Sequence, residues 1–295
     1  MYQNKITHII SCLHVYKKRY IAPEMERELK LELKTCVGIG DLIFIYSYAE
    51  QVKHLYSEIK ICPEYSILSA YRSGSKESYD FSKKFVAFLF SEPYYILGEH
   101  CNDKPLTLSW DLFNGDIKAK YVDLRSKLCL PEKLDIGTDN YIVINTKIRD
   151  FDIRFWNKTK NDFFKILRST SKKIVLMGER RIGINKEQNI YTVYEDLKDA
   201  LYGIDHLDFT KEVILDYPNF DELRRDLTII RDAKASINFG ASGMAVLSPT
   251  VADVSIGYRL DNYTFFDDFL LGINKNSLVT NNIEDFLRFT SGICL

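Results

Sequence analysis

The stretch NFDELRRDLTIIRDAKASINFGASGMAVLSPTVADVSIGY, residues 219–258, decides the fold class. It begins with a predicted helix over 219–233, in which Asn219 can cap the first turn and Glu222 stands three residues on. One face of this helix is apolar, formed by Phe220, Leu223, Leu227 and Ile230. A strand over 235–240, a helix over 243–248 and a strand over 253–258 follow. Strands separated by helical patterns predict right-handed βαβ units and a parallel sheet.

The same alternation precedes this stretch. YIVINT at 141–146 and KKIVLMG at 172–178 have the apolar runs of buried strands, and NDFFKILRST at 161–170 has the pattern of a helix. The second half of the chain is therefore predicted to be a Rossmann-like domain.

A further strand, turn and helix pattern lies near the N-terminus. In LKLELKTCV, residues 29–37, leucines alternate with polar residues as in a half-buried strand, although the same letters could also end a helix. The turn GIGD follows at 38–41. LIFIYSYAEQVKHLY at 42–56 then carries apolar residues at spacings of three and four, the stripe of an amphipathic helix.

The middle of the chain is rich in turn-forming residues, most of all LPEKLDIGTDN at 130–140. We place a domain boundary there, which predicts an α/β protein of two Rossmann-like domains with parallel sheets, residues 1–135 and 136–295. The last helix, around 283–291, is expected to pack back on the first domain.

Composition limits the kinds of partner. The 295 residues exceed the usual size of one domain, and 46% hydrophobic content can fill one large core or two smaller ones. The 40 basic and 41 acidic residues nearly cancel, so no global field attracts nucleic acid or an anionic membrane. Any anion site must be local.

The six cysteines are scattered without a CxxC pair, which favours reduced, mostly structural thiols, and the five histidines have no metal-ligand spacing. We therefore expect no metal site. The N-terminus lacks the apolar core of a signal peptide, and no apolar run approaches the roughly 20 residues that cross a bilayer. We expect a soluble cytoplasmic protein, at most peripherally bound to the inner face of a membrane.

The first candidate for chemistry is the turn that holds Gly40 and Asp41. Glycines between strand and helix let a ligand approach the backbone, and an aspartate at the carboxyl end of the sheet can serve as a general base. The alternative is that Asp41 merely caps its helix.

The second candidate follows the strand at 172–178. Gly178 permits close approach, and after Glu179 the guanidinium groups of Arg180 and Arg181 can fork onto phosphate oxygens. The alternative is a solvated or salt-bridged arginine pair.

The third candidate is the small-residue loop between the strand at 235–240 and the next helix. It would expose backbone N–H groups at a helix N-terminus, a ready-made phosphate site, and the alternative is a structural tight turn. Its residues are Gly240, Ala241, Ser242, Gly243 and Met244.

The fourth candidate lies at the end of the strand at 141–146. The side chains of Lys147 and Arg149 point in the direction opposite to that of Ile148 between them, so one or both could reach a ligand at the strand ends. The alternative is an interdomain salt bridge, which is the commoner role of such residues.

These segments together resemble the heptosyltransferase-like glycosyltransferases, family nine. The GIGD turn is similar to the GD-containing first loop of that family, and the run from IVLMGE at 174–179 to residue 258 resembles its nucleotide-sugar domain. The resemblance implies the GT-B fold, an inverting and metal-independent mechanism, Asp41 as the catalytic base and residues 240–244 beneath the diphosphate. The acidic residue and histidine that the family usually has near NFGASGMAVL are missing, so an ADP-heptose donor is not implied.

The resemblance implies a glycosyltransferase that needs no cofactor. A nucleotide-diphosphate sugar is the donor and a glycan or glycolipid is the acceptor. Asp41 would deprotonate the acceptor hydroxyl, while Arg180, Arg181 and the amides of 240–244 would stabilise the departing nucleoside diphosphate. The alternatives are a sugar-nucleotide epimerase of the same fold and a non-catalytic Rossmann-like binding protein.

Overall fold

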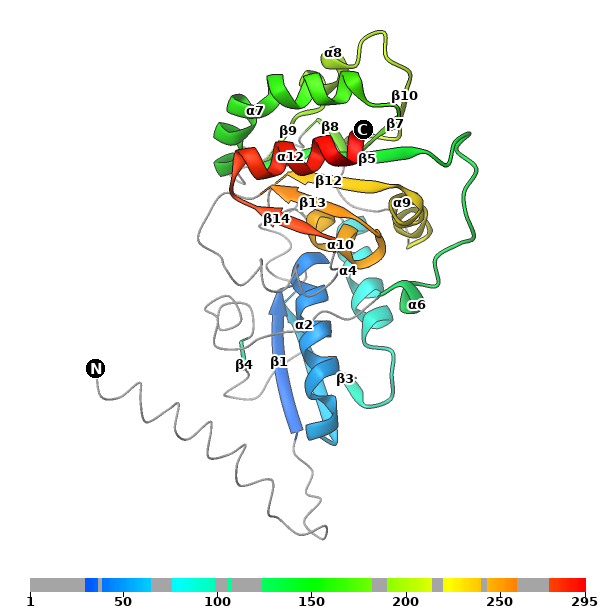
Figure 1. Ribbon diagram of the computed structural model, residues 1–295. Helices are drawn as coiled ribbons and strands as arrows, with labels where there is room; N and C mark the ends of the chain where they lie inside the picture. The colour runs from blue at the N-terminus through cyan, green and yellow to red at the C-terminus, as the bar shows by residue number, and fades with distance from the viewer. Residues whose placement is uncertain are drawn as a thin grey trace, which may run out of the picture.

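The computed structural model (Figure 1) is an α/β protein with two larger parallel sheets, which confirms the predicted fold class. It describes residues 30–36, 39–64, 76–98, 106–107, 124–181, 190–213, 220–239, 243–258 and 276–295.

The first half forms a four-stranded sheet of order β3-β2-β1-β4, in which every described pair is parallel. Its elements are β1 (Lys30–Cys36), α2 (Ile39–Val52), the short 3-10 helix η2 (Lys53–Leu55), β2 (Glu58–Glu64), α4 (Lys76–Leu89), β3 (Tyr95–Leu97), β4 (Leu106–Thr107) and α6 (Arg125–Leu128). The strand and helix predicted on either side of the GIGD turn are therefore both present.

The second half forms a six-stranded parallel sheet of order β10-β7-β5-β12-β13-β14, and two small two-stranded sheets extend it. Its strands are β5 (Tyr141–Asn145), β6 (Lys147–Arg149), β7 (Lys173–Met177), β8 (Glu179–Arg181), β9 (Ile190–Thr192), β10 (His206–Asp208), β11 (Lys211–Val213), β12 (Ala235–Phe239), β13 (Ser255–Tyr258) and β14 (Leu278–Thr280). Its helices are α7 (Asp150–Ser169), α8 (Tyr194–Ala200), α9 (Phe220–Asp232), α10 (Gly243–Val251) and α12 (Ile283–Cys294).

Helices cover both faces of the six-stranded sheet (Figure 1). On one face α7 and α12 pack together, with an edge-to-face contact of 5.5 Å between the rings of Phe155 and Phe286. The alternate residues of β5 divide accordingly, because Ile142 belongs to this core and Val143 to the core on the α9 and α10 side.

The last helix corrects one expectation. α12 packs against α7, β13 and β14, and the core that it joins through Phe286 and Cys294 contains residues of the second half only. Its apolar face matches the sheet surface beside α7, so among the described residues this helix packs on the second half and not, as we expected, on the first.

The core on the other face continues into the first half. Leu42 and Ile43 of α2, Leu247 of α10, Leu227 of α9 and Val143 of β5 belong to one buried cluster. The division into domains at 135/136 stays a prediction, but hydrophobic packing joins the parts on its two sides.

α2 is not the amphipathic helix that the sequence predicted. Residues 42–47 are all buried, because α2 lies between its own sheet and α10. A helix that is apolar on every side is typical of such a position.

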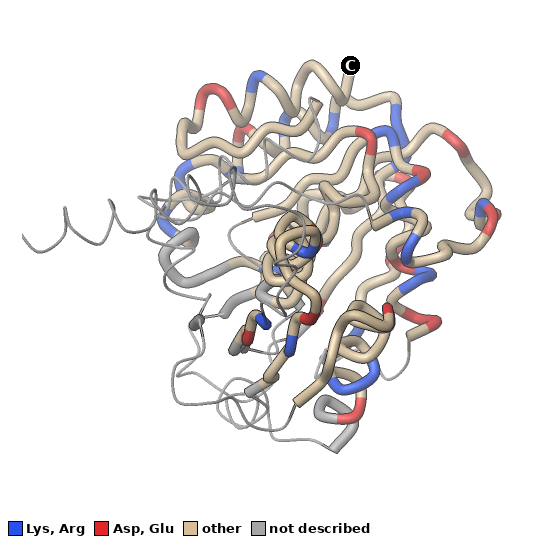
Figure 2. Tube along the Cα trace, turned by 90° about the horizontal axis from the view of Figure 1, so that it is seen from below, with Lys and Arg blue, Asp and Glu red and all other residues tan. Residues whose placement is uncertain are grey.

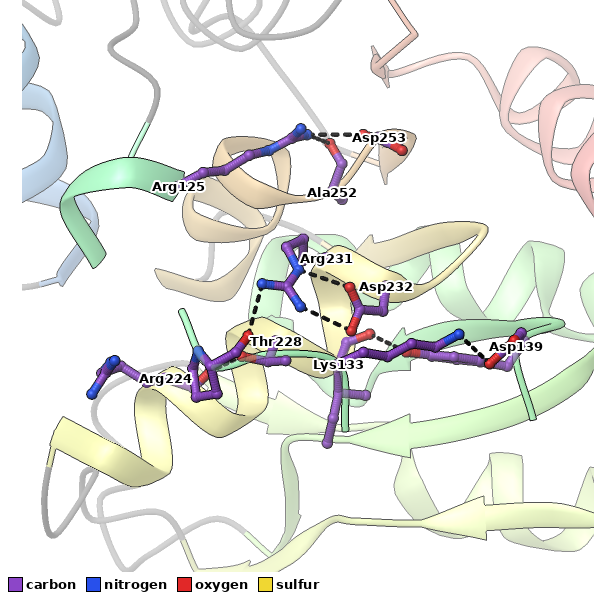
Figure 3. A network of polar contacts seen from close by, with 12 residues as sticks. Arg125, Lys133, Asp139, Arg224, Thr228, Arg231, Asp232, Ala252 and Asp253 are labelled. Atoms are coloured by element: carbon purple, nitrogen blue, oxygen red, sulfur yellow. Dashed lines mark hydrogen bonds and ion pairs between the residues drawn. The ribbon is translucent and has the colours of Figure 1, made fainter. Parts of the chain in front are cut away.

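Three arginines hold the segment that connects the two halves, α6 and the residues after it, against α9 and α10 (Figure 3). On α9, Arg224 Nε donates to the carbonyl of Leu128 at 3.0 Å and Arg231 Nη1 donates to that of Pro131 at 3.0 Å. Arg125 on α6 donates to the carbonyl of Ala252 at 3.1 Å, just beyond α10. Arg224 and Arg231 on α9 therefore hold the connector in place.

Two surface properties follow from the described residues. Basic and acidic residues are interspersed along the outer elements (Figure 2). None of the described helices has the length and apolarity needed to span a bilayer.

The cysteines depart in one place from the expected reduced thiols. Cys62, buried in β2, is disulfide-bonded, whereas Cys129 and Cys294 are free. Spacing along the chain does not report which thiols the fold brings within bonding distance.

Candidate functional site

In the six-stranded sheet, the side on which the chain adds successive strands changes between β5 and β12. From β5 the chain adds β7 and β10 on one side, and it then adds β12, β13 and β14 on the other. In open α/β sheets, ligands bind outside the carboxyl ends of the strands at such a reversal. This rule places the candidate site where β5 ends at Asn145 and β12 ends at Phe239.

Two helices begin at this place. α10 starts at Gly243, shortly after β12, and its first turns pack against α2, which starts just after β1 (Figure 1). A Cβ added to Gly40 would lie 3.4 Å from Cγ2 of Val246. The structure therefore brings together the GIGD turn and the start of the helix predicted at 243–248, although about 200 residues separate them in the sequence.

The N-terminal turns of both helices favour negative charge. The first backbone N–H groups of a helix have no intrahelical partner, and they carry the positive end of the helix dipole. Gly40 in the first turn of α2 contacts Val246 in the first turn of α10, so an anion bound beside this contact would lie near the positive ends of both helices.

Several predicted residues of these two turns can be placed only by their backbone. Asp41 is the third residue of α2, and Gly243 and Met244 are the first two residues of α10, but their side chains lie outside the described part of the chain. Gly240, Ala241 and Ser242 lie outside it altogether.

Gly178 has a role within the chain itself. Its φ is +104°, a conformation that favours glycine, and an added Cβ would lie 2.8 Å from Thr146 Oγ1 and 3.2 Å from the Thr146 amide nitrogen. The glycine therefore lets the turn after β7 pack against the end of β5.

Lys147 and Glu179 form an ion pair beside this turn. Lys147 Nζ lies 3.0 Å from Glu179 Oε1, and the glutamate side chain is almost completely buried. The backbone carbonyl of Glu179 also accepts hydrogen bonds from the hydroxyls of Thr146 at 2.8 Å and Thr192 at 2.6 Å. Glu179 is thus engaged by its neighbours, and it balances the charge of Lys147.

Arg180 points toward the edge of the sheet away from α10. Its guanidinium donates to Thr210 Oγ1 at 2.8 Å and to Asp208 Oδ2 at 3.1 Å, and it lies over the Tyr194 ring. Asp208 ends β10, on the side of β7 opposite to β5 and β12. The structure therefore gives Arg180 the salt-bridged arrangement that we kept as an alternative.

The pKa values of this cluster reflect the same contacts. Burial raises the pKa of the Asp208 carboxyl, but hydrogen bonds from Thr210 and Tyr194 and the charge of Arg180 outweigh it, so the net pKa is lowered. Burial raises the pKa of the Tyr194 phenol, and its hydrogen bond to Asp208 raises it further. Asp208 is therefore held ionised as the partner of Arg180.

Arg149 ends β6, which pairs with β9, and Arg181 ends β8, which pairs with β11. The side chains of these two arginines lie outside the described residues.

A buried polar cluster under α10 was missed by the sequence analysis. Asn145 Nδ2 donates to Asn238 Oδ1 at 2.5 Å, and Ser248 Oγ of α10 donates to the same oxygen at 3.2 Å. Asn238 Nδ2 donates to Ser236 Oγ and Ser255 Oγ, both at 3.3 Å. These five residues, which we call the polar cluster, cross the sheet from β5 to β13 at the reversal point. The available indication was an asparagine near the end of each of the apolar strands YIVIN and ASINF.

Comparisons with known proteins give a structural match alone. No family model matches the chain, and no curated protein matches it. The solved structures that match include glycosyltransferases, one of which is described as a member of family nine.

Two of these structures are of TibC. One is described as a dodecameric iron-containing heptosyltransferase in complex with ADP-D-β-D-heptose, with 14% identity over 81% of this chain and 63% of that chain, at a TM-score of 0.42. The other, from enterotoxigenic E. coli, has 16% identity over 79% of this chain and 59% of that chain, at a TM-score of 0.42. The chain thus spans less than two thirds of the length of either.

The third is the glycosyl transferase of family 9 from Veillonella parvula. It has 10% identity over 89% of this chain and 88% of that chain, at a TM-score of 0.41. At these identities and TM-scores the match assigns neither a family nor a substrate to this chain.

Proposed function

We propose that the chain is a glycosyltransferase that moves a sugar from a nucleotide-diphosphate sugar to a hydroxyl group of a glycan or glycolipid acceptor, with inversion and without a metal ion. The observation that supports this proposal most is the meeting of the first turns of α2 and α10 beside the reversal point of the sheet. This arrangement provides two helix dipoles for an anion and an aspartate on the opposite element.

In the proposed reaction, the diphosphate lies at the start of α10 and the acceptor lies on the α2 side. Asp41 takes the proton of the acceptor hydroxyl as that oxygen attacks the anomeric carbon. The bond from the anomeric carbon to the diphosphate oxygen breaks, and the nucleoside diphosphate leaves with the electron pair. The amides of residues 240–244 stabilise the charge that develops on the leaving group.

The basic residues differ in how readily they could contact the phosphate groups of the donor. Lys147 lies near the end of β5 and is partly exposed, so it can bring positive charge to the strand ends while it stays paired with Glu179. Arg180 would have to leave Asp208 and Thr210 before it could reach a ligand. We therefore propose Lys147 ahead of Arg180 as a phosphate contact, and we leave Arg149 and Arg181 as further candidates.

Replacing Gly243 with valine is expected to weaken the binding of a nucleoside diphosphate at least about tenfold. The β-branched side chain would cover the backbone N–H groups at the start of α10 and weaken phosphate binding. Valine in a helix lowers stability by less than about 1 kcal/mol relative to alanine. Calorimetric titration of the variant and the wild type measures the loss. Because valine is a better helix former than glycine, the melting temperature is expected to change little.

Gly292→Val in α12 is the matched control. Gly292 is also a helical glycine, and an added Cβ meets nothing within 4 Å. It should leave nucleotide affinity unchanged. If the Gly243→Val variant bound the nucleotide as tightly as the wild type, α10 would not be the phosphate site.

A further inference from the structure

The polar cluster contains one hydrogen-bond acceptor without a donor. Asn145 Oδ1 has no partner, although the residue is buried, with 1% of its surface exposed. An amide oxygen that is shielded from solvent and unpaired is rare in a folded protein, because its lost hydrogen bonds to water are not replaced. The acceptor capacity of this oxygen is therefore not used by the chain itself.

Asn145 differs from the other buried atoms without a partner. Among the described residues these are the hydroxyls of Ser47, Ser82, Ser277 and Thr290, and a hydroxyl can rotate to find a partner. The Asn145 amide is fixed, because its Nδ2 is held by Asn238 Oδ1, which also accepts from Ser248. With this bond in place, the Asn145 amide oxygen is turned away from Asn238.

The position of this oxygen indicates a ligand. Asn145 is the last residue of β5, at the point where the sheet reverses and beside the strand that leads into α10. Two independent observations thus point to this edge of the sheet, the nearby N-terminus of α10, which favours an anion, and a buried acceptor without a donor.

The chemistry of an amide oxygen restricts what can reach it. It accepts hydrogen bonds and repels phosphate oxygens, so its partner is an O–H or N–H group. A nucleotide sugar carries such hydroxyl groups together with a diphosphate, which the start of α10 favours. We propose that Asn145 Oδ1 accepts a hydrogen bond from a hydroxyl of the donor, on its ribose or on the transferred sugar, and that Asn145 is a specificity-determining residue. This inference rests on the proposed function.

The test compares three proteins with three ligands by calorimetric titration. The proteins are the wild type, Asn145→Ala and Ser248→Ala, and the ligands are inorganic pyrophosphate, the nucleoside diphosphate that binds the wild type most tightly, and its sugar conjugate. Ser248→Ala is the matched control, because it removes a hydrogen bond to the same Asn238 oxygen and leaves Asn145 in place. Pyrophosphate controls for the anion site, because it carries no sugar hydroxyl.

Asn145→Ala is expected to bind the hydroxyl-bearing ligand about three- to tenfold more weakly, while pyrophosphate affinity is unchanged and Ser248→Ala binds all three ligands as the wild type does. A loss that is already present with the nucleoside diphosphate assigns the hydroxyl to the ribose. A loss confined to the conjugate assigns it to the sugar. The inference would be overturned if Asn145→Ala lost as much affinity for pyrophosphate as for the hydroxyl-bearing ligand, or if Ser248→Ala lost as much affinity as Asn145→Ala. Either result would assign the effect to repacking. No loss of affinity in Asn145→Ala would also overturn it and would assign the donor to a buried water molecule.

Deoxyribose and deoxysugar analogues test the same contact from the ligand side if Asn145→Ala does not fold. Removal of one hydroxyl is expected to weaken binding to the wild type by a similar factor, and uniform affinity across the analogues would overturn the inference. A wild type that binds pyrophosphate and nucleoside diphosphates but is insensitive to Asn145 refutes the inference alone. A wild type that binds none of these ligands refutes the proposed function, and the inference falls with it.

Discussion

The Asp41→Asn variant is expected to transfer sugar about 10²–10⁴-fold more slowly than the wild type while it still binds the nucleotide. Asparagine keeps the size of aspartate and much of its ability to cap a helix, but it cannot accept a proton at neutral pH. Asp41 lies in the first turn of α2, at the place where that helix meets α10. Turnover and melting temperature, measured on the same preparation, separate loss of catalysis from loss of stability.

Asp285→Asn is the matched control for this prediction. Asp285 is the third residue of α12, as Asp41 is of α2, and its carboxylate is paired with Arg288 of the same helix, so turnover should stay at the wild-type level. If Asp41 only caps its helix, Asp41→Asn would lose about 1 kcal/mol of stability or less and keep its activity. Unchanged turnover with the true donor and acceptor would remove Asp41 from the mechanism.

Leu247→Ala is expected to destabilise the protein by about 2–5 kcal/mol, and to lower one unfolding transition that involves both halves of the chain. Leu247 is completely buried in α10, which packs against both α2 and α9. The cavity would therefore lie in the core that the two halves share. Denaturant unfolding followed by tryptophan fluorescence and by circular dichroism measures the size and the number of transitions.

Leu55→Ala is the control for a leucine outside this core. Leu55 is 40% exposed, so its truncation should change stability by less than about 0.5 kcal/mol. The contrary result would be two separate unfolding transitions, with Leu247→Ala shifting the midpoint of only one. It would show that the halves fold independently and that their packing adds little to stability.

The second half of the fold was largely predictable, because its local patterns and its packing agree. The strands at 141–145, 173–177 and 235–239 and the helix at 220–232 lie within a few residues of their predicted bounds. Each has an apolar period that matches the face it buries. The helix predicted at 161–170 begins earlier, at Asp150, because the turns before it also face the sheet through Phe155 and Trp156.

Contacts between distant residues could not be predicted. Nothing in the local sequence of α2 shows that α10 covers its outer side, and nothing near Arg180 shows that Asp208 and Thr210 stand within hydrogen-bonding distance. The Asn145 and Asn238 pair depends on two strands that are neighbours only after the sheet has reversed its direction of growth. The sequence could therefore supply candidate residues, which stay predictions, but not the contacts that engage them within the fold.

Thermal denaturation of the wild type with ADP, GDP, UDP, CDP and pyrophosphate tests the nucleotide-sugar site most directly. A ligand that binds only the native state at 100 times its Kd adds about 2.7 kcal/mol of stability. At least one nucleoside diphosphate is expected to raise the melting temperature by several degrees, and more than pyrophosphate does. A melting temperature that none of these ligands raises would contradict a nucleotide-sugar site at the start of α10.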